Sequence, residues 1–109
     1  MIEIREYLSD ADVSPFARWF EALNTPAALK VRTALARMGA GNLTNAKSVG
    51  AGVHECRIDF GPGYRLYFGK DGTRLVILLG GGTKKRQDRD VATAKIYWRA
   101  YKSRKRTEG

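Results

Sequence analysis

Residues 53–68, VHECRIDFGPGYRLYF, contain two segments of alternating apolar and polar side chains, separated by Gly61-Pro62-Gly63. Such alternation predicts half-buried strands, and a short interruption rich in glycine and proline predicts a hairpin loop. A three-residue loop places Phe60 opposite Tyr64, and counting back from this pair gives the remaining register. The predicted pairs are Phe60/Tyr64, Ile58/Leu66 and Cys56/Phe68 on an apolar face, and Asp59/Arg65 and Arg57/Tyr67 on a polar face that also carries Glu55.

The segment before this hairpin predicts a short strand and two helices. Ile2 and Ile4 alternate with charged residues, which is typical of a strand. Ser14-Pro15 and Thr25-Pro26 each combine a capping side chain with a proline suited to the first helical turn. The apolar residues that recur at helical spacing are Phe16, Trp19, Phe20 and Leu23 in the first helix, and Ala28, Val31, Leu35 and Met38 in the second. Together they predict a helical hairpin, followed by a loop over residues 42–52.

After the hairpin, residues 74–79 are apolar enough for a third, central strand, and Gly80-Gly81-Gly82 is expected to end it. A basic loop over residues 83–88 then leads into a last helix over residues 88–102. The order β-α-α-β-β-β-α predicts one α+β domain over residues 1–102. The helices are expected to pack around a largely antiparallel sheet that keeps one face open, and residues 103–109 to form a frayed basic tail.

The charge of the chain is high and uneven. Its 109 residues carry a formal net charge of +9, and half of the 20 cations lie within residues 84–106. An excess of this size attracts polyanions, above all nucleic acid. The alternative is a solvated basic surface with no binding role.

Other features exclude several classes of protein. Cys56 is the single cysteine, so no internal disulfide can form, which favours the reducing cytoplasm. No segment approaches the roughly 18 apolar residues of a membrane span. With one histidine, His54, and one cysteine, a zinc site lacks ligands, and no metal or other cofactor is expected.

Residues 53–68 resemble the central hairpin of RelE/HigB-type toxins, and in particular those of the phage-related addiction-module killer proteins. Residues 78–84, with Gln87, Asp90, Ala94 and Trp98 after them, resemble the third strand, loop and final helix of that subgroup. The similarity extends over nearly the whole chain. It departs at Thr83, Lys85 and Arg86, where many members carry an acidic residue and two small polar ones.

This resemblance implies the toxin of a type II toxin–antitoxin module, an mRNA interferase that inhibits translation by cleaving messages, usually on the ribosome. It also implies a cognate antitoxin, often of the helix-turn-helix type. Two other functions stay open: inhibition of DNA gyrase by a ParE-like relative of the same fold, and non-enzymatic binding of RNA or ribosomes.

RNA can be cut without a metal when its own 2′-hydroxyl attacks the adjacent phosphate. The enzyme must then remove the proton of that hydroxyl, stabilise the charge of the phosphorane and protonate the leaving 5′-oxygen. Arginine suits the phosphate because its planar fork matches two oxygens. Arg57 and Arg65 are therefore expected to clamp it; the alternative for Arg65 is an ion pair with Asp59. Glu55 either acts as general base or orients Arg57. Lys84 is the candidate for the general acid or the charge-stabilising group.

Further candidates for RNA binding lie on both sides of Lys84. Lys85 and Arg86 belong to the basic loop, and Arg89 and Arg99 to the last helix, where a solvated face is the alternative. Tyr67 either stacks on a base or packs in the core. The predicted register turns His54 and Cys56 toward the core, so neither is expected to be catalytic.

Overall fold

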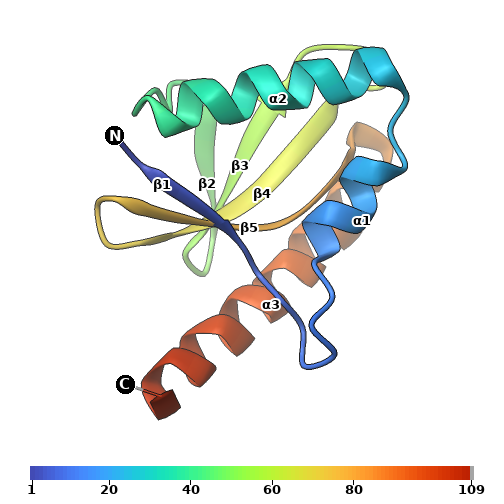
Figure 1. The fold of residues 1–109 in the computed structure, drawn as a ribbon. Coiled ribbons are helices and arrows are strands. Elements are labelled where there is room, and N and C mark those ends of the chain that lie inside the picture. Colours follow the sequence, from blue (N-terminus) through green and yellow to red (C-terminus); the bar gives the residue numbers. More distant parts are fainter. Residues whose placement is uncertain (109) are drawn as a thin grey trace.

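The computed structural model describes residues 1–108 and contains three α-helices and one five-stranded sheet (Figure 1). The elements in chain order are β1 (Glu3–Glu6), α1 (Pro15–Glu21), α2 (Thr25–Gly39), β2 (Ala46–Gly50), β3 (Val53–Ile58), β4 (Tyr64–Asp71), β5 (Leu75–Thr83), the 3₁₀ turn η1 (Lys84–Arg86) and α3 (Gln87–Glu108). The strand order is β1-β5-β4-β3-β2, with β1 parallel to β5 and every other pair antiparallel. The predicted α+β class is confirmed.

The helix starts follow from side-chain caps. Ser14 Oγ accepts a hydrogen bond from Ala17 N at 3.0 Å, as its position before Pro15 predicts. In α2 the cap is Asn24, whose Oδ1 accepts from Ala27 N at 2.9 Å, so the prediction that Thr25 caps this helix is wrong by one residue.

The β3–β4 hairpin has the predicted faces and a different register. Its loop spans five residues, 59–63, and Ile58 pairs with Tyr64. The loop is closed by a hydrogen bond from Gly63 N to Phe60 O, and both Gly61 and Gly63 adopt positive φ, which glycine tolerates. Every predicted pair is therefore displaced by two residues. Because side chains alternate with period two, this displacement leaves each side chain on its predicted face.

A strand lies where a loop was expected. β2 pairs with β3 at the edge of the sheet, with Lys47 opposite Glu55 and a bulge after Ser48. Only Ala46 and Val49 of this strand are partly buried, so the apolar alternation that reveals a strand is weak here. The prediction of a loop over residues 42–52 is thus wrong for residues 46–50.

The glycine run continues β5 and does not end it. Gly80, Gly81 and Gly82 pair with residues of β4, past a bulge in the β4–β5 ladder. A Cβ on Gly81 would overlap the Trp19 indole, and one on Gly82 would overlap the Asp90 carboxylate. Gly81 and Gly82 are explained by these close approaches, which local sequence patterns do not predict, whereas Gly80 adopts a φ of 147° that glycine tolerates.

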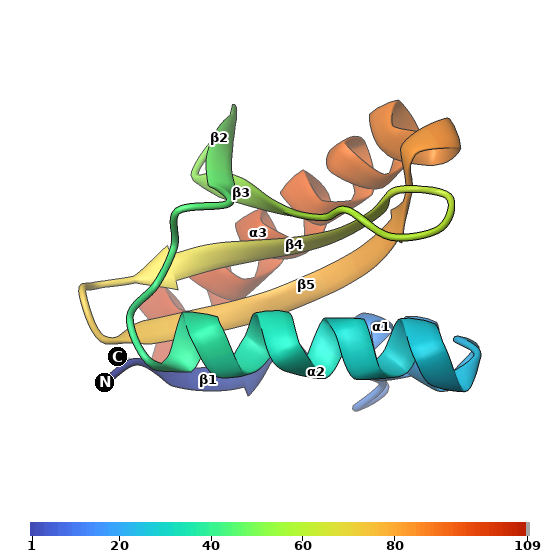
Figure 2. The same cartoon turned by 90° about the horizontal axis from the view of Figure 1, so that it is seen from above.

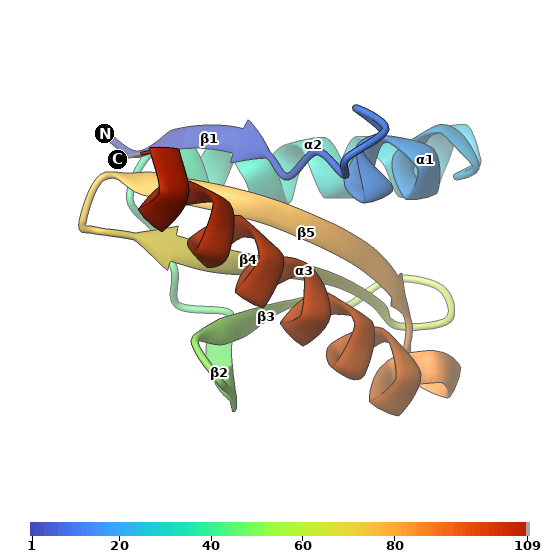
Figure 3. The same ribbon diagram turned by 90° about the horizontal axis from the view of Figure 1, so that it is seen from below.

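Both faces of the sheet are covered. On one face α1 and α2 pack on residues such as Leu66 and Phe68, and on the other α3 packs Ala94 and Trp98 on Tyr67 and its neighbours. Figure 2 shows α2 on one side of the sheet and α3 behind it, and Figure 3 shows α3 lying across β3, β4 and β5. The expectation of an open face is therefore wrong, because the apolar stripe of α3 is buried there.

The last helix is longer than predicted. It extends through Glu108, where a frayed tail was expected from residue 103; Gly109 lies outside the described residues. Arg104 donates to Leu8 O at 2.9 Å and to Asp10 Oδ1 at 3.0 Å, and Lys105 pairs with Asp71. These contacts hold the end of α3 against the body of the protein. No helix within residues 1–108 has the length and apolarity of a membrane span.

Candidate functional site

A cleft of about 590 Å³ opens at the end of the sheet where β2 begins and the β3–β4 loop turns. We call it the cationic cleft, because three exposed cations from three different elements line it: Lys47 of β2, Arg57 of β3 and Lys84 of η1. Its other lining residues are Thr44, Asn45, Ala46, Ile58, Asp59, Gly63, Tyr64 and Arg65. The structure thus brings Arg57 and Lys84 together, as predicted.

Arg65 also reaches this cleft, but its guanidinium is almost fully buried. Its Nε lies 2.6 Å from Glu55 Oε1, and the two side chains are 4% and 0% exposed. Its Nη1 donates to Gly63 O at 2.8 Å, at the end of the hairpin loop. The predicted alternative partner, Asp59, is replaced by Glu55, because the observed register sets Glu55 diagonally across from Arg65.

Glu55 is the centre of a buried polar cluster. Besides the contact with Arg65, its Oε1 accepts a hydrogen bond from Gln87 Nε2 at 2.8 Å, and its Oε2 lies 3.8 Å from Lys47 Nζ. A carboxylate so enclosed is poorly placed to take a proton from a bound molecule. Its close contacts are with Arg65 and Gln87, whereas Arg57, which it was expected to orient if it was not the general base, is exposed to solvent.

Tyr67 is 1% exposed and packs in the core beneath α3. Burial, followed by the negative charges of Glu55 and Asp90, raises the pKa of its phenol above the ordinary value. It therefore stays neutral, and it offers no exposed ring for stacking. Of the two predicted roles for Tyr67, core packing is the observed one.

The basic loop is folded as η1 and the first turn of α3. Lys85, Arg86 and Arg89 are exposed there and surround a shallow hollow that shares Lys84 with the cationic cleft. Asp88 lines the same hollow. Partial burial raises the pKa of the Asp90 carboxyl, in the first turn of α3, against the influence of Arg86 and Arg89. This part of the surface extends the cationic cleft along the helix start.

Arg99 does not belong to this group. It lies ten residues after Arg89, about 15 Å further along α3, beside Lys102, Lys105 and Arg106. The structure therefore separates the predicted RNA-binding cations into two surfaces.

His54 faces the α1/α2 side of the sheet, as predicted, and stacks on Phe68 with ring centroids 5.3 Å apart. Burial and the nearby Lys70 lower its pKa. Cys56 is buried on the same side, and burial raises the pKa of its thiol. Within residues 1–108, no group of three or more His, Cys, Asp or Glu side chains could hold a metal ion.

Sequence reasoning missed two residues of this region. Lys47 lies in the segment that was predicted to be a loop, and it approaches Glu55 only because β2 pairs with β3. Gln87 was noted as part of a resemblance, but its hydrogen bond to Glu55 joins positions 32 residues apart. No local spacing predicts such a contact.

The fold and the cleft together define a small α+β protein with a cationic site at one end of its sheet. The chain is 43% identical over 82 residues to an uncharacterized protein of Haemophilus influenzae strain Rd. The matched region is 74% of this chain and 83% of that protein. The chain belongs to the same family as that protein. No family model matches the chain, and no solved structure matches it.

Proposed function

We propose that this chain is the toxin component of a RelE/HigB-type toxin–antitoxin module, a metal-independent endoribonuclease that cleaves mRNA on the ribosome in the cytoplasm. The observation that carries the proposal is the gathering of Lys47, Arg57 and Lys84 around one cleft, with Arg65 at its base. The element order supports it as well, since it differs from the order expected for such a toxin only by β2.

In this proposal Arg57 and Lys84 contact the scissile phosphate, because both are exposed on the cleft. Their charges stabilise the phosphorane formed when the 2′-hydroxyl attacks, and Lys84 donates a proton to the leaving 5′-oxygen. Arg65 is a positioning residue, which ties β3 to the hairpin loop through Glu55 and Gly63.

The proton acceptor differs from the one first expected. Glu55 is fully buried, already forms an ion pair with Arg65 and accepts a hydrogen bond from Gln87. Asp59 is exposed and lines the same cleft, so its carboxylate is better placed to accept the proton of the 2′-hydroxyl. Lys85, Arg86 and Arg89 would bind the RNA backbone beyond the cut.

A second candidate is a basic module that binds RNA or ribosomes without cleaving. It is favoured by the burial of Glu55 and Arg65, two of the four residues predicted to be catalytic. The two functions respond differently to loss of one cation. A binding module loses affinity gradually with each charge, whereas an enzyme loses activity abruptly at one or two positions.

The test is to induce the chain in growing cells and map the 5′ ends of messages within minutes. We expect new ends for the wild type, and at least a hundredfold fewer for Arg57→Ala and Lys84→Ala. Arg74→Ala and Lys70→Ala, which remove exposed cations at the β4–β5 turn, are the matched controls. Coexpression of a neighbouring antitoxin reading frame should restore growth. Absence of new ends would contradict the proposal, and failure of supercoiling with intact translation would instead identify a ParE-like gyrase inhibitor.

A further inference from the structure

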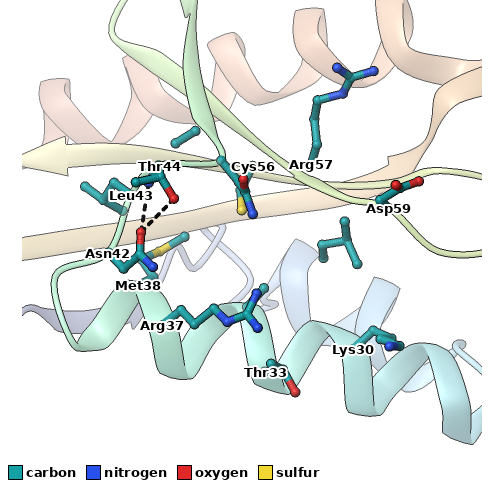
Figure 4. A pocket seen from close by; sticks show the side chains of 14 residues that line it. Lys30, Thr33, Arg37, Met38, Asn42, Leu43, Thr44, Cys56, Arg57 and Asp59 are labelled. Atoms are coloured by element: carbon teal, nitrogen blue, oxygen red, sulfur yellow. Dashed lines mark hydrogen bonds between the residues drawn. The ribbon is translucent and has the colours of Figure 1, made fainter.

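A second cleft lies on the other side of β3, between this strand and α2 (Figure 4). We call it the α2 cleft. Its volume is about 260 Å³, somewhat below the roughly 300–1,000 Å³ of sites that hold whole small molecules, so it has room for a fragment of such a molecule. Its floor is apolar and comes from Met38, Cys56 and Ile58, all buried.

The rim of the α2 cleft is polar and cationic. Asn42 Oδ1 accepts from Thr44 N at 3.1 Å and from Thr44 Oγ1 at 2.8 Å, which fixes the segment that forms one wall. Asn45 is exposed at the same wall, where its amide can donate and accept. Lys30 and Arg37 reach the cleft from α2, as Figure 4 shows.

The two clefts meet around the edge of the sheet. They share six lining residues: Thr44, Asn45, Ala46, Arg57, Ile58 and Asp59. β2 begins at Ala46, and beyond it the last contact with β3 is the hydrogen bond from Arg57 N to Asn45 O at 3.3 Å. Figure 4 shows Arg57 projecting from β3 away from α2. A bound chain can therefore contact Arg57 on one side and enter the α2 cleft on the other.

We propose that the α2 cleft binds the base of one nucleotide, on the strand whose phosphate lies in the cationic cleft. An apolar floor with amide groups at the rim suits a base, which has apolar faces and a hydrogen-bonding edge. Lys30 and Arg37 outnumber Asp59 around it, which favours a polyanion over an uncharged peptide. The inference rests on the proposed function and supplies its site of base selection.

The test is nuclear magnetic resonance of the full chain, titrated with the four ribonucleoside 3′-monophosphates and with ribose 5-phosphate, which has no base. We expect the nucleotides to shift the methyl signals of Met38 and Leu43, which line the α2 cleft and not the cationic cleft, to different extents for different bases. Ribose 5-phosphate should shift only signals of the cationic cleft, such as Lys84. Asn45→Ala should raise the dissociation constant of the preferred nucleotide about three- to tenfold, which is the effect of one hydrogen bond. Thr73→Ala lies outside both clefts and should leave that constant unchanged.

Equal shifts with and without a base, or no shift at Met38 and Leu43, would overturn the inference. So would shifts produced there by an antitoxin peptide and by no nucleotide, which would make the α2 cleft a site for a protein partner. Binding is measured here without cleavage, so the two proposals fail separately. If the wild type cleaves RNA but shows no such shifts, only the proposed base site is contradicted. If it shows the shifts but does not cleave RNA, only the proposed nuclease activity is contradicted.

Discussion

The Glu55–Arg65 pair ties the candidate site to the stability of the fold. Both side chains are almost fully removed from solvent, and each makes a further hydrogen bond that holds it in place. Burying two charges costs free energy, so such an ion pair adds little stability over an apolar pair. Removing one partner, however, leaves the other charge buried and unpaired. A loss of activity on mutating Arg65 would therefore not by itself identify a phosphate ligand.

We expect Arg65→Ala to lower the free energy of unfolding by about 3–5 kcal/mol, because it leaves the Glu55 carboxylate buried without its partner. Urea denaturation measures this. The double variant Glu55→Leu/Arg65→Met, which removes both charges, should recover most of the loss. A loss below about 1 kcal/mol for Arg65→Ala would show that the pair is not isolated from water.

Two tyrosines predict how stability changes at alkaline pH. Burial, with a hydrogen bond to Asp71 at 2.6 Å, raises the pKa of Tyr101 to about 12, and burial also raises the pKa of Tyr67. Unfolded tyrosines lose their protons near pH 10, while these two keep theirs in the folded protein. The folded state then binds more protons, so the free energy of unfolding should fall from pH 10 to pH 12.

Tyr101→Phe should make that fall shallower, as followed by urea denaturation at each pH. The variant still contains Tyr67, so part of the slope should persist. An unchanged slope would mean that Tyr101 does not contribute to it.

At the scale of elements, strong apolar alternation predicted β3, β4 and the faces of their side chains. Capping residues with helical spacing predicted α1 and α2, and helical spacing alone predicted most of α3. β2 could not be predicted, because an edge strand with two partly buried residues carries little periodic signal. The hairpin register was missed because a loop of three residues and one of five give the same division of faces.

Local sequence patterns could not predict contacts between segments that are far apart in the chain. The glycine run pairs with β4 as part of β5, and glycine is needed at Gly81 and Gly82 because Trp19 of α1 and Asp90 of α3 approach them closely. In the site, sequence reasoning found Arg57 and Lys84 on one surface, but the burial of Arg65, Glu55 and Tyr67 depends on where α3 packs.

Gly82→Ala tests this reading of β5. The new methyl would overlap the Asp90 carboxylate, so Asp90 or the strand must shift, and we expect a loss of about 1–3 kcal/mol in thermal or urea unfolding. Gly39→Ala at the end of α2 is the control, since its nearest neighbours would lie 3.8 Å from the new Cβ. That variant should be neutral or slightly stabilising. Equal effects of the two substitutions would contradict the packing explanation.

At the scale of the whole molecule, the net charge of +9 is distributed by the fold into separate surfaces. Arg104 and Lys105 are engaged with Asp10 and Asp71 and hold α3 in place. Lys47, Arg57 and Lys84 converge on the cationic cleft. We infer that this convergence, and not the net charge, makes the site.

The most direct measurement is the single-turnover cleavage of a ribosome-bound message by purified protein, with the product ends identified. We expect cleavage that leaves a 2′,3′-cyclic phosphate, that fails when the cut nucleotide lacks its 2′-hydroxyl, and that falls at least a hundredfold in Arg57→Ala and in Lys84→Ala. Arg74→Ala and Lys70→Ala should cleave normally. Equal, severalfold losses in all four variants would instead reflect net charge alone and would contradict the account.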